Sequence, residues 1–307
     1  DGFHDNQYGG RKGRQPQSAV LNKVLSLDVI RYYGEPSAMV DNDATACYDR
    51  IIPYLTTYML KRLGMPYFLS RFMCNVLRDM QYSIRTDKGI SAKYSSNDRP
   101  LYGTGQGAGW SPPCWAANSD VISHAMAQHT PGLLLVHPNK QIYSNRHLDV
   151  FVDDTNHGVT HDAMQLFKPS EPNPVVQKHD HIYEQIQANM KFYHGILEAT
   201  GGALAWPKCK AYIMLFEWCN GIKKLLPTKD TYPPLEIKTS YSNETFFIKL
   251  ANPDEAFKML GAFVALDGNV RAQVEVLRKY ASKWASRLDL SYLTPHEAIM
   301  AYTQVLF

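Results

Sequence analysis

Two adjacent acids, Asp153 and Asp154, follow a short apolar run and are the residues whose types and spacing best suit chemistry. The run at 147–152 has the valine and phenylalanine content of a strand, and residues 155–158 have the composition of a turn. Successive side chains on an extended chain point to opposite faces, so the two acids are not equivalent. One of them can meet a cation directly while the other lies to the side.

Asp43 ends a second apolar run, and a helical pattern follows it at 51–63. Carboxylates brought together from separate strands are costly unless a cation neutralises them, and Mg²⁺ binds carboxylate and phosphate oxygens together. Two such ions can activate an attacking hydroxyl and stabilise the leaving oxygens of a displacement at phosphorus. The pattern therefore predicts a site for two Mg²⁺ ions, with Mn²⁺ as a substitute, and nucleotidyl transfer as the reaction class.

Two glycine-rich stretches have the composition of phosphate or nucleotide loops. Residues 9–14 are all glycine or basic, and Arg11, Lys12 and Arg14 supply donors for phosphate oxygens. Every second residue from 103 to 109 is glycine, and Ser111-Pro112 then has the composition of a helix N-cap and first turn. Either stretch alone is also compatible with a solvated loop ahead of a helix.

The overall composition is that of a globular protein. The chain has 307 residues, of which 45% are hydrophobic and 20% charged, and its net charge of +3 permits nucleic-acid binding without arguing for it. Five cysteines without metal-ligand spacing predict neither a zinc site nor a disulfide framework, and favour a reducing, intracellular compartment. No apolar run approaches ~18 residues, so we expect no membrane span. The abrupt first residues and the helical pattern at the end suggest a piece of a longer polyprotein with further domains.

The order and spacing of these segments resemble the reverse transcriptase family, in a style closest to non-LTR retrotransposon and group II intron enzymes. The resemblance covers roughly residues 7–265, and six segments in the family's order carry it: 7–14, 43–49, 106–112, 151–154, 201–209 and 260–261. The chain departs from the family pattern at Gly10, Gln15-Pro16, Ala205 and Cys209. None of these departures touches the presumed metal ligands.

The resemblance implies an α+β right-hand polymerase fold whose palm is an antiparallel sheet backed by helices. The palm would comprise 34–50 and 106–265, partial fingers 1–33 and 51–105, and the start of a truncated thumb 266–307. It also implies RNA-templated DNA synthesis, with an RNA template, a DNA or RNA primer and dNTPs as partners.

The resemblance also implies roles for single residues. Asp43 and Asp153 would bind both metal ions directly and Asp154 less directly, while Lys208, with Lys210 as its rival, would protonate or neutralise the leaving pyrophosphate. The Tyr48 ring would clash with a 2′-hydroxyl and so favour dNTPs. The remaining assignments are Ala44, Gln106 and Gly107 for the nucleotide, and Arg11, Lys12, Arg14, Leu260 and Gly261 for template or primer.

Two other functions stay open at this point. One is an RNA-dependent RNA polymerase, against which the bulky ring of Tyr48 counts. The other is a non-catalytic relic of a reverse transcriptase that only binds nucleic acid, against which the intact acids count.

Overall fold

A computed structural model describes residues 2–95, 103–105, 107–137, 143–161, 175–240, 244–289 and 292–306. The chain forms two compact units, Asp1–Pro253 and Asp254–Phe307. No helix among the described residues is both long and apolar enough to cross a membrane.

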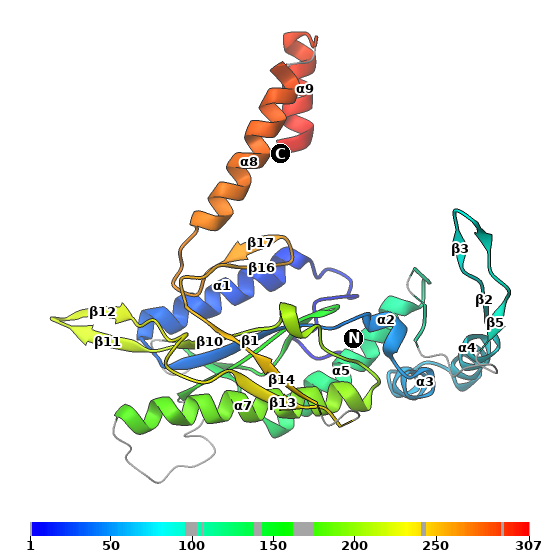
Figure 1. Cartoon of the computed structure of the whole chain (residues 1–307), viewed down its shortest axis with the longest axis horizontal. Helices are drawn as coiled ribbons and strands as arrows, with labels where there is room; N and C mark the ends of the chain where they lie inside the picture. Colours follow the sequence, from blue (N-terminus) through cyan, green and yellow to red (C-terminus); the bar gives the residue numbers. More distant parts are fainter. Residues whose placement is uncertain are drawn as a thin grey trace. The chain divides into compact units, whose positions relative to one another are not determined.

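A five-stranded sheet is the centre of the first unit, in the order β15-β10-β1-β9-β8 (Figure 1). Neighbouring strands are antiparallel except β10 and β15, which run parallel. The sheet is therefore mixed, and the expectation of a purely antiparallel palm is wrong at this edge, because a long connection returns the chain to β10 in the same direction. The strands are β1 (Ser37–Asp43), β8 (Asp149–Phe151), β9 (Asp154–Thr160), β10 (Lys210–Met214) and β15 (Leu250–Ala251).

Two long helices, α5 (Ser111–His129) and α7 (Val175–Ala199), back one face of this sheet. The sequence predicts helix at 176–200, and the structure confirms it. Its apolar residues recur every three to four positions, so one stripe of α7 is fully buried against alternate residues of β1 such as Ala38 and Val40. That stripe consists of Ile182, Ile186, Met190, Tyr193 and Leu197.

Helix α1 (Pro16–Tyr33) covers side chains on the opposite face, where its buried Lys23 meets Asp41 of β1. It ends at Gly34, whose φ of 68° is left-handed and whose N–H donates to the Ile30 carbonyl at 2.9 Å. A hairpin of β6 (Leu133–Val136) and β7 (Tyr143–Arg146) lies beside α1.

Between β1 and α5 the chain forms a short helix, a helical hairpin and a narrow ribbon. These are α2 (Cys47–Arg50), α3 (Pro53–Arg62) and α4 (Tyr67–Asp79), followed by β2 (Gln81–Tyr82), β3 (Arg85–Thr86), β4 (Gly89–Ile90) and β5 (Tyr94–Ser95). The sequence predicts helices at 51–63 and 67–80 and a hairpin that joins 82–86 to 92–95, and the structure confirms all three.

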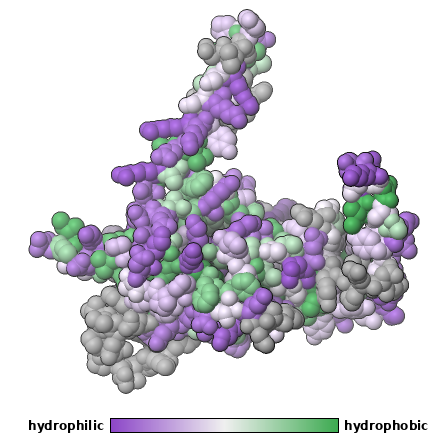
Figure 2. Space-filling view, viewed as in Figure 1, coloured by the Kyte–Doolittle hydropathy of each residue, from purple (hydrophilic) through white to green (hydrophobic). Residues whose placement is uncertain are grey.

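After β10 come two further ribbons and then the second unit. The ribbons are β11 (Phe216–Cys219) with β12 (Ile222–Leu225), and β13 (Leu235–Lys238) with β14 (Thr245–Ile248). The second unit contains β16 (Phe257–Met259), β17 (Ala262–Val264), α8 (Arg271–Asp289) and α9 (Pro295–Leu306). Hydrophilic side chains cover much of the visible face of α8 (Figure 2).

Candidate active site

The two adjacent acids lie at a tight hairpin between β8 and β9. Phe151 pairs with Asp154, so Val152 and Asp153 form a two-residue turn, and Val152 has a left-handed φ of 56°. The predicted strand therefore ends one residue early. The prediction that residues 155–158 form a turn is wrong, because they belong to β9 and pair with β1.

Residues typical of turns lie in β9 because their polar side chains find polar partners on α7 and β1. Thr155 Oγ1 and the Tyr193 hydroxyl of α7 are 2.9 Å apart, and Asn42 Nδ2 lies 3.2 Å from His157 Nδ1. Burial lowers the pKa of His157 to about 3, so its ring is neutral. Pairing with β1 and these contacts outweigh local turn preference.

Three other segments hold the turn in place. The indole N–H of buried Trp115 donates to the Val152 carbonyl, and the Ala44 N–H donates to the Asp153 carbonyl at 3.1 Å. Gly9 lies against the same turn, since a Cβ there would be 2.5 Å from the Val152 nitrogen. A glycine in the predicted phosphate loop therefore serves close packing against the hairpin.

Asp43, the last residue of β1, lies directly opposite Asp154 in the register. Directly opposed residues of antiparallel strands have Cα atoms ~4.5–5.5 Å apart and side chains on the same face. Burial, and then the charges of Asp153, Asp43 and Asp41, raise the pKa of Asp154 to about 6. The raised pKa reflects burial first, and after it the neighbouring negative charges, which Lys208 only partly offsets.

Lys208 compensates part of this charge. It ends the short 3-10 helix η1 (Trp206–Lys208), and its Nζ donates to both carboxylate oxygens of Asp43, at 2.9 and 3.2 Å. The side chain of Lys208 is 67% exposed, so this pair contributes little to stability. Lys210, the rival candidate, is the first residue of β10 and lies opposite Asp41 in the register.

Two further acids, Asp41 and Asp149, lie on the same sheet, and a basic side chain neutralises each of them. Asp41 accepts from fully buried Lys23 and from Asn156 Nδ2 at 2.6 Å, while Asp149 pairs with Arg146 at 2.6 Å. Each of these two acids therefore has its own cation.

The outer group of Asp43, Asp153 and Asp154 differs, since within the described part of the chain only Lys208 pairs with it. Three acids and one lysine leave a formal charge of −2, which suits divalent cations. Hard carboxylate oxygens are the donor set that Mg²⁺ and Mn²⁺ prefer, so the residues fit these ions. Across the described residues no three acid, histidine or cysteine side chains form a ready-made metal cluster, and both oxygens of Asp43 are directed to Lys208.

Tyr48 lies on α2, just beyond Asp43. Ala46 has a left-handed φ of 47° and turns the chain into this helix. Burial, then Cys47 and Asp153, raise the pKa of the half-buried Tyr48 hydroxyl, so the ring lies within the field of the acid group. Ala44 is buried, and its N–H is used by Asp153.

The glycine-rich loop packs on α2. The Thr104 N–H donates to the Tyr48 carbonyl at 2.7 Å, and a Cβ on Gly103 would lie 2.5 Å from the carbonyl carbon of Asp49. Gly107 is exposed with a φ of 90°, while Gln106 lies outside the described residues.

Ser111 is the first residue of α5, so the prediction that it caps the helix is wrong. Its hydroxyl instead donates back to the loop carbonyl of Gly105 at 2.6 Å. The N-cap residue is Trp110, whose indole N–H donates to the Thr104 carbonyl at 2.8 Å. Both side chains fix the loop.

The basic residues of 11–14 differ in their environments. Arg11 donates to the His4 carbonyl at 2.9 Å and thereby braces the N-terminal segment. Arg14 lies over the Tyr8 ring at 5.6 Å, and Lys12 is exposed. Lys12 and Arg14 therefore remain the more accessible phosphate donors of the three.

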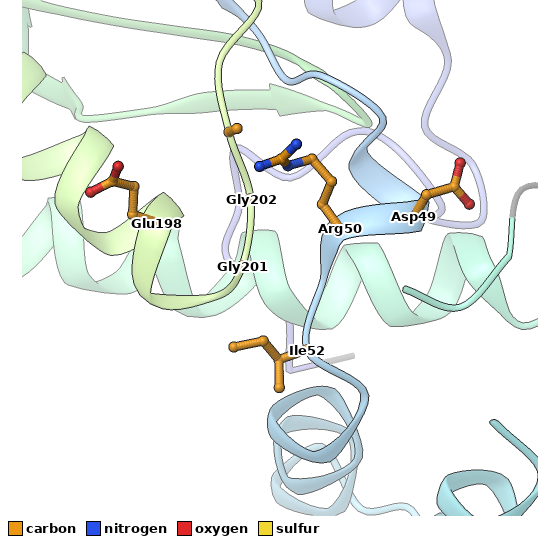
Figure 3. Close-up of a pocket in the computed structure, with 7 residues that line it drawn as sticks. Asp49, Arg50, Ile52, Glu198, Gly201 and Gly202 are labelled. Atoms are coloured by element: carbon orange, nitrogen blue, oxygen red, sulfur yellow. The ribbon is translucent and has the colours of Figure 1, made fainter. Parts of the chain in front are cut away.

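A cavity of about 440 Å³ lies behind α2, but its lining includes none of the three acids of the candidate site. Figure 3 shows Arg50 directed toward Gly202 and Asp49 pointing the other way. Glu198 lines the same cavity and is paired with His194 at 3.5 Å.

Leu260 and Gly261 belong to the second unit. They are the two-residue turn of the β16–β17 hairpin, with φ values of 49° and 90°. The sequence predicts one short strand at 258–263, which is wrong, because two left-handed residues reverse the chain there.

Comparison with solved structures finds a weak likeness in fold. No protein-family model matches the chain, and no curated protein matches it. Part of a telomerase structure from Candida albicans, in complex with a TWJ fragment of telomeric RNA, superposes with a TM-score of 0.42 and 12% sequence identity. The match covers 85% of this chain and 34% of that one, so the chain spans about a third of its length. The function proposed for this chain rests on its own residues.

Proposed function

We propose that this chain is the catalytic part of an RNA-templated DNA polymerase of the retroelement type. The observation that carries the proposal is the convergence of Asp43, Asp153 and Asp154 at one end of the sheet with a single pairing lysine. Under this proposal, 34–50 and 106–265 serve as palm, 1–33 and 51–105 as fingers, and 266–307 as the start of a thumb.

The acids would hold two Mg²⁺ ions, which when bound activate a primer 3′-hydroxyl and stabilise the leaving oxygens. Asp43 and Asp153 are the proposed direct ligands, with Asp154 beside them. Lys208 would leave Asp43 once cations arrive. Its ammonium then lies near the pyrophosphate, where it donates a proton or offsets charge.

Tyr48 is the proposed sugar discriminator, and Ala44, Gln106 and Gly107 the proposed nucleotide contacts. The short α2 and the packed loop at 103–105 fix the backbone of Tyr48 from two sides. A fixed ring next to the acids suits the exclusion of a 2′-hydroxyl better than a mobile one would. Lys12 and Arg14, and in the second unit Leu260 and Gly261, are proposed contacts of template or primer.

The experiment is primer extension on an RNA template with dNTPs or rNTPs, comparing the parent with Tyr48→Ala. The proposal predicts strong dNTP preference in the parent and a gain of rNTP use of at least ~10-fold in the variant, since a steric clash is removed. Equal use of rNTPs by the parent would favour an RNA polymerase. Extension by neither protein with any nucleotide, in a chain that includes any flanking domains, would favour a non-catalytic nucleic-acid-binding role.

A further inference from the structure

The outer face of the helical hairpin α3–α4 carries exposed aromatic rings with basic side chains between them. Tyr54 and Tyr58 on α3 are 63% and 70% exposed, and Tyr67 on α4 is 60% exposed. Lys61 and Arg71 are exposed on the same two helices. We call Tyr54, Tyr58, Lys61, Tyr67, Arg71 and Arg78 the aromatic–basic face.

These residues share one side of the hairpin. Positions 54, 58 and 61, like 67, 71 and 78, recur at helical spacing and so lie along one stripe of each helix. Contacts join the stripes at both ends: the Lys61 ammonium lies 5.0 Å from the centre of the Tyr67 ring, and Arg78 interacts with Tyr54. The buried residues of both helices, such as Met59 and Met73, point the other way.

The charge of this part of the chain differs from the rest. Residues 53–95 contain seven Lys or Arg and two Asp, a formal charge of +5, whereas the whole chain carries +3 and the remainder is therefore net negative. Arg78 pairs with Asp79, but Arg71 and Lys61 form no ion pair with any described residue.

Such a face complements a single strand of nucleic acid. Every base offers a ring on which an exposed tyrosine can stack, and the phosphates between bases require cations at short intervals. A protein partner would have to supply a cluster of acids to meet the net +5 of residues 53–95, whereas a single strand supplies a phosphate with every nucleotide. A duplex would hide its base faces from the rings.

We infer that the aromatic–basic face binds single-stranded nucleic acid, with bases stacked on Tyr54, Tyr58 and Tyr67 and phosphates held by Lys61 and Arg71. In the ribbon that follows α4, Tyr82 of β2 and Tyr94 of β5 stack on each other at 5.8 Å. The face therefore serves a single strand that has not yet paired, RNA or DNA. This inference rests on the proposed function and extends it, because the aromatic–basic face gives an unpaired strand a binding site in addition to the candidate active site.

Fluorescence anisotropy with labelled single-stranded RNA, single-stranded DNA and duplex of equal length tests this inference. The assay contains chelator and no nucleotide, and uses Asp153→Asn as the background, so binding can be measured whether or not nucleotidyl transfer occurs. Matched controls are Tyr143→Ala, an equally exposed tyrosine on β7, and Lys191→Ala on α7. Circular dichroism melting shows whether each variant is folded.

Two double variants separate stacking from charge. Tyr54→Ala with Tyr58→Ala should weaken single-strand binding by ~10- to 100-fold, with the slope of log affinity against log salt unchanged. Lys61→Gln with Arg71→Gln should reduce that slope by about 1.4, since two phosphate contacts are lost. Duplex binding should change less than single-strand binding for the tyrosine pair.

The inference is overturned if folded tyrosine variants bind single strands as tightly as the Tyr143→Ala control. It is equally overturned if the basic pair leaves the salt slope unchanged, or if the face mediates self-association in place of oligonucleotide binding. Equal losses for RNA and DNA, or a larger loss for one, both support the inference and identify the strand. Absence of nucleotide addition by the parent protein, together with single-strand binding that depends on the aromatic–basic face, would contradict only the proposed function.

Discussion

At the residue scale, the site is defined by unequal neutralisation of acids on neighbouring strands. Asp41 and Asp149 each have a close basic partner, whereas Asp43, Asp153 and Asp154 share Lys208. The inner pairs stabilise the charges that the sheet must bury, and the outer group retains charge for a ligand. Without bound cations, repulsion among the three outer acids lowers the stability of the folded protein.

Asp154→Asn should therefore stabilise the apoprotein at neutral pH. The folded-state pKa of Asp154, about 6, exceeds the ordinary value of 3.8. The folded parent thus binds more protons between these pH values, and its stability falls as pH rises through them. We expect the variant to exceed the parent by about 1–3 kcal/mol in free energy of unfolding at pH 7.5, and by much less at pH 4.

Urea unfolding in chelator at both pH values measures this difference in free energy. Other titrating groups such as His157 are present in both proteins, so their contributions cancel when the variant is compared with the parent. Addition of Mg²⁺ should narrow the gap by stabilising the parent. A gap that does not change with pH would mean that the pKa of Asp154 is not raised in the folded protein.

At the element scale, the Asp153 hairpin is positioned by segments distant in sequence: the Gly9 segment, α5 through Trp115, and the end of β1 through Ala44.

Gly9→Ala should destabilise the protein by about 1–3 kcal/mol and slow nucleotide addition, because the new methyl overlaps the backbone of Val152. Gly195→Ala, in α7 with open space around it, should instead stabilise by up to about 1 kcal/mol. Thermal melting and extension rates compare the two, and a Gly9→Ala protein that matches the parent in both would show that the hairpin tolerates displacement.

Sequence patterns predict the helices and strands better than the turns and tertiary contacts between them. Long periodic helices such as α7, and the strands that end in Asp43 and Phe151, follow from apolar spacing. The strand at 155–158 does not, because its polar residues are satisfied by Tyr193 and Asn42, which the pairing brings close. The burial of Lys23 against Asp41 and the packing role of Gly9 likewise depend on tertiary contacts. The exposed stripe of Tyr54 and Tyr58 is not among the sequence predictions, and it is the structure that shows which side of α3 is buried.

At the scale of the whole molecule, the first unit contains the complete sheet and the candidate site. The contacts of β15 with β10 complete that sheet before Pro253. A chain that ends at Pro253 should therefore fold and retain the pH-dependent stability difference described for Asp154. Circular dichroism and urea unfolding measure this, and loss of cooperative unfolding in the shortened chain would show that residues 254–307 are required for the first unit to fold.

The central claim is that the three outer acids perform metal-dependent nucleotide addition. Its most direct test is the rate of single-nucleotide addition to a primer on an RNA template, in excess enzyme with Mg²⁺, for the parent, Asp153→Asn and the control Asp230→Asn, an exposed acid away from the site. We predict that Asp153→Asn loses at least ~100-fold in rate while Asp230→Asn matches the parent, because only Asp153 lies with Asp43 and Asp154. Unimpaired addition by a folded Asp153→Asn protein would contradict the account.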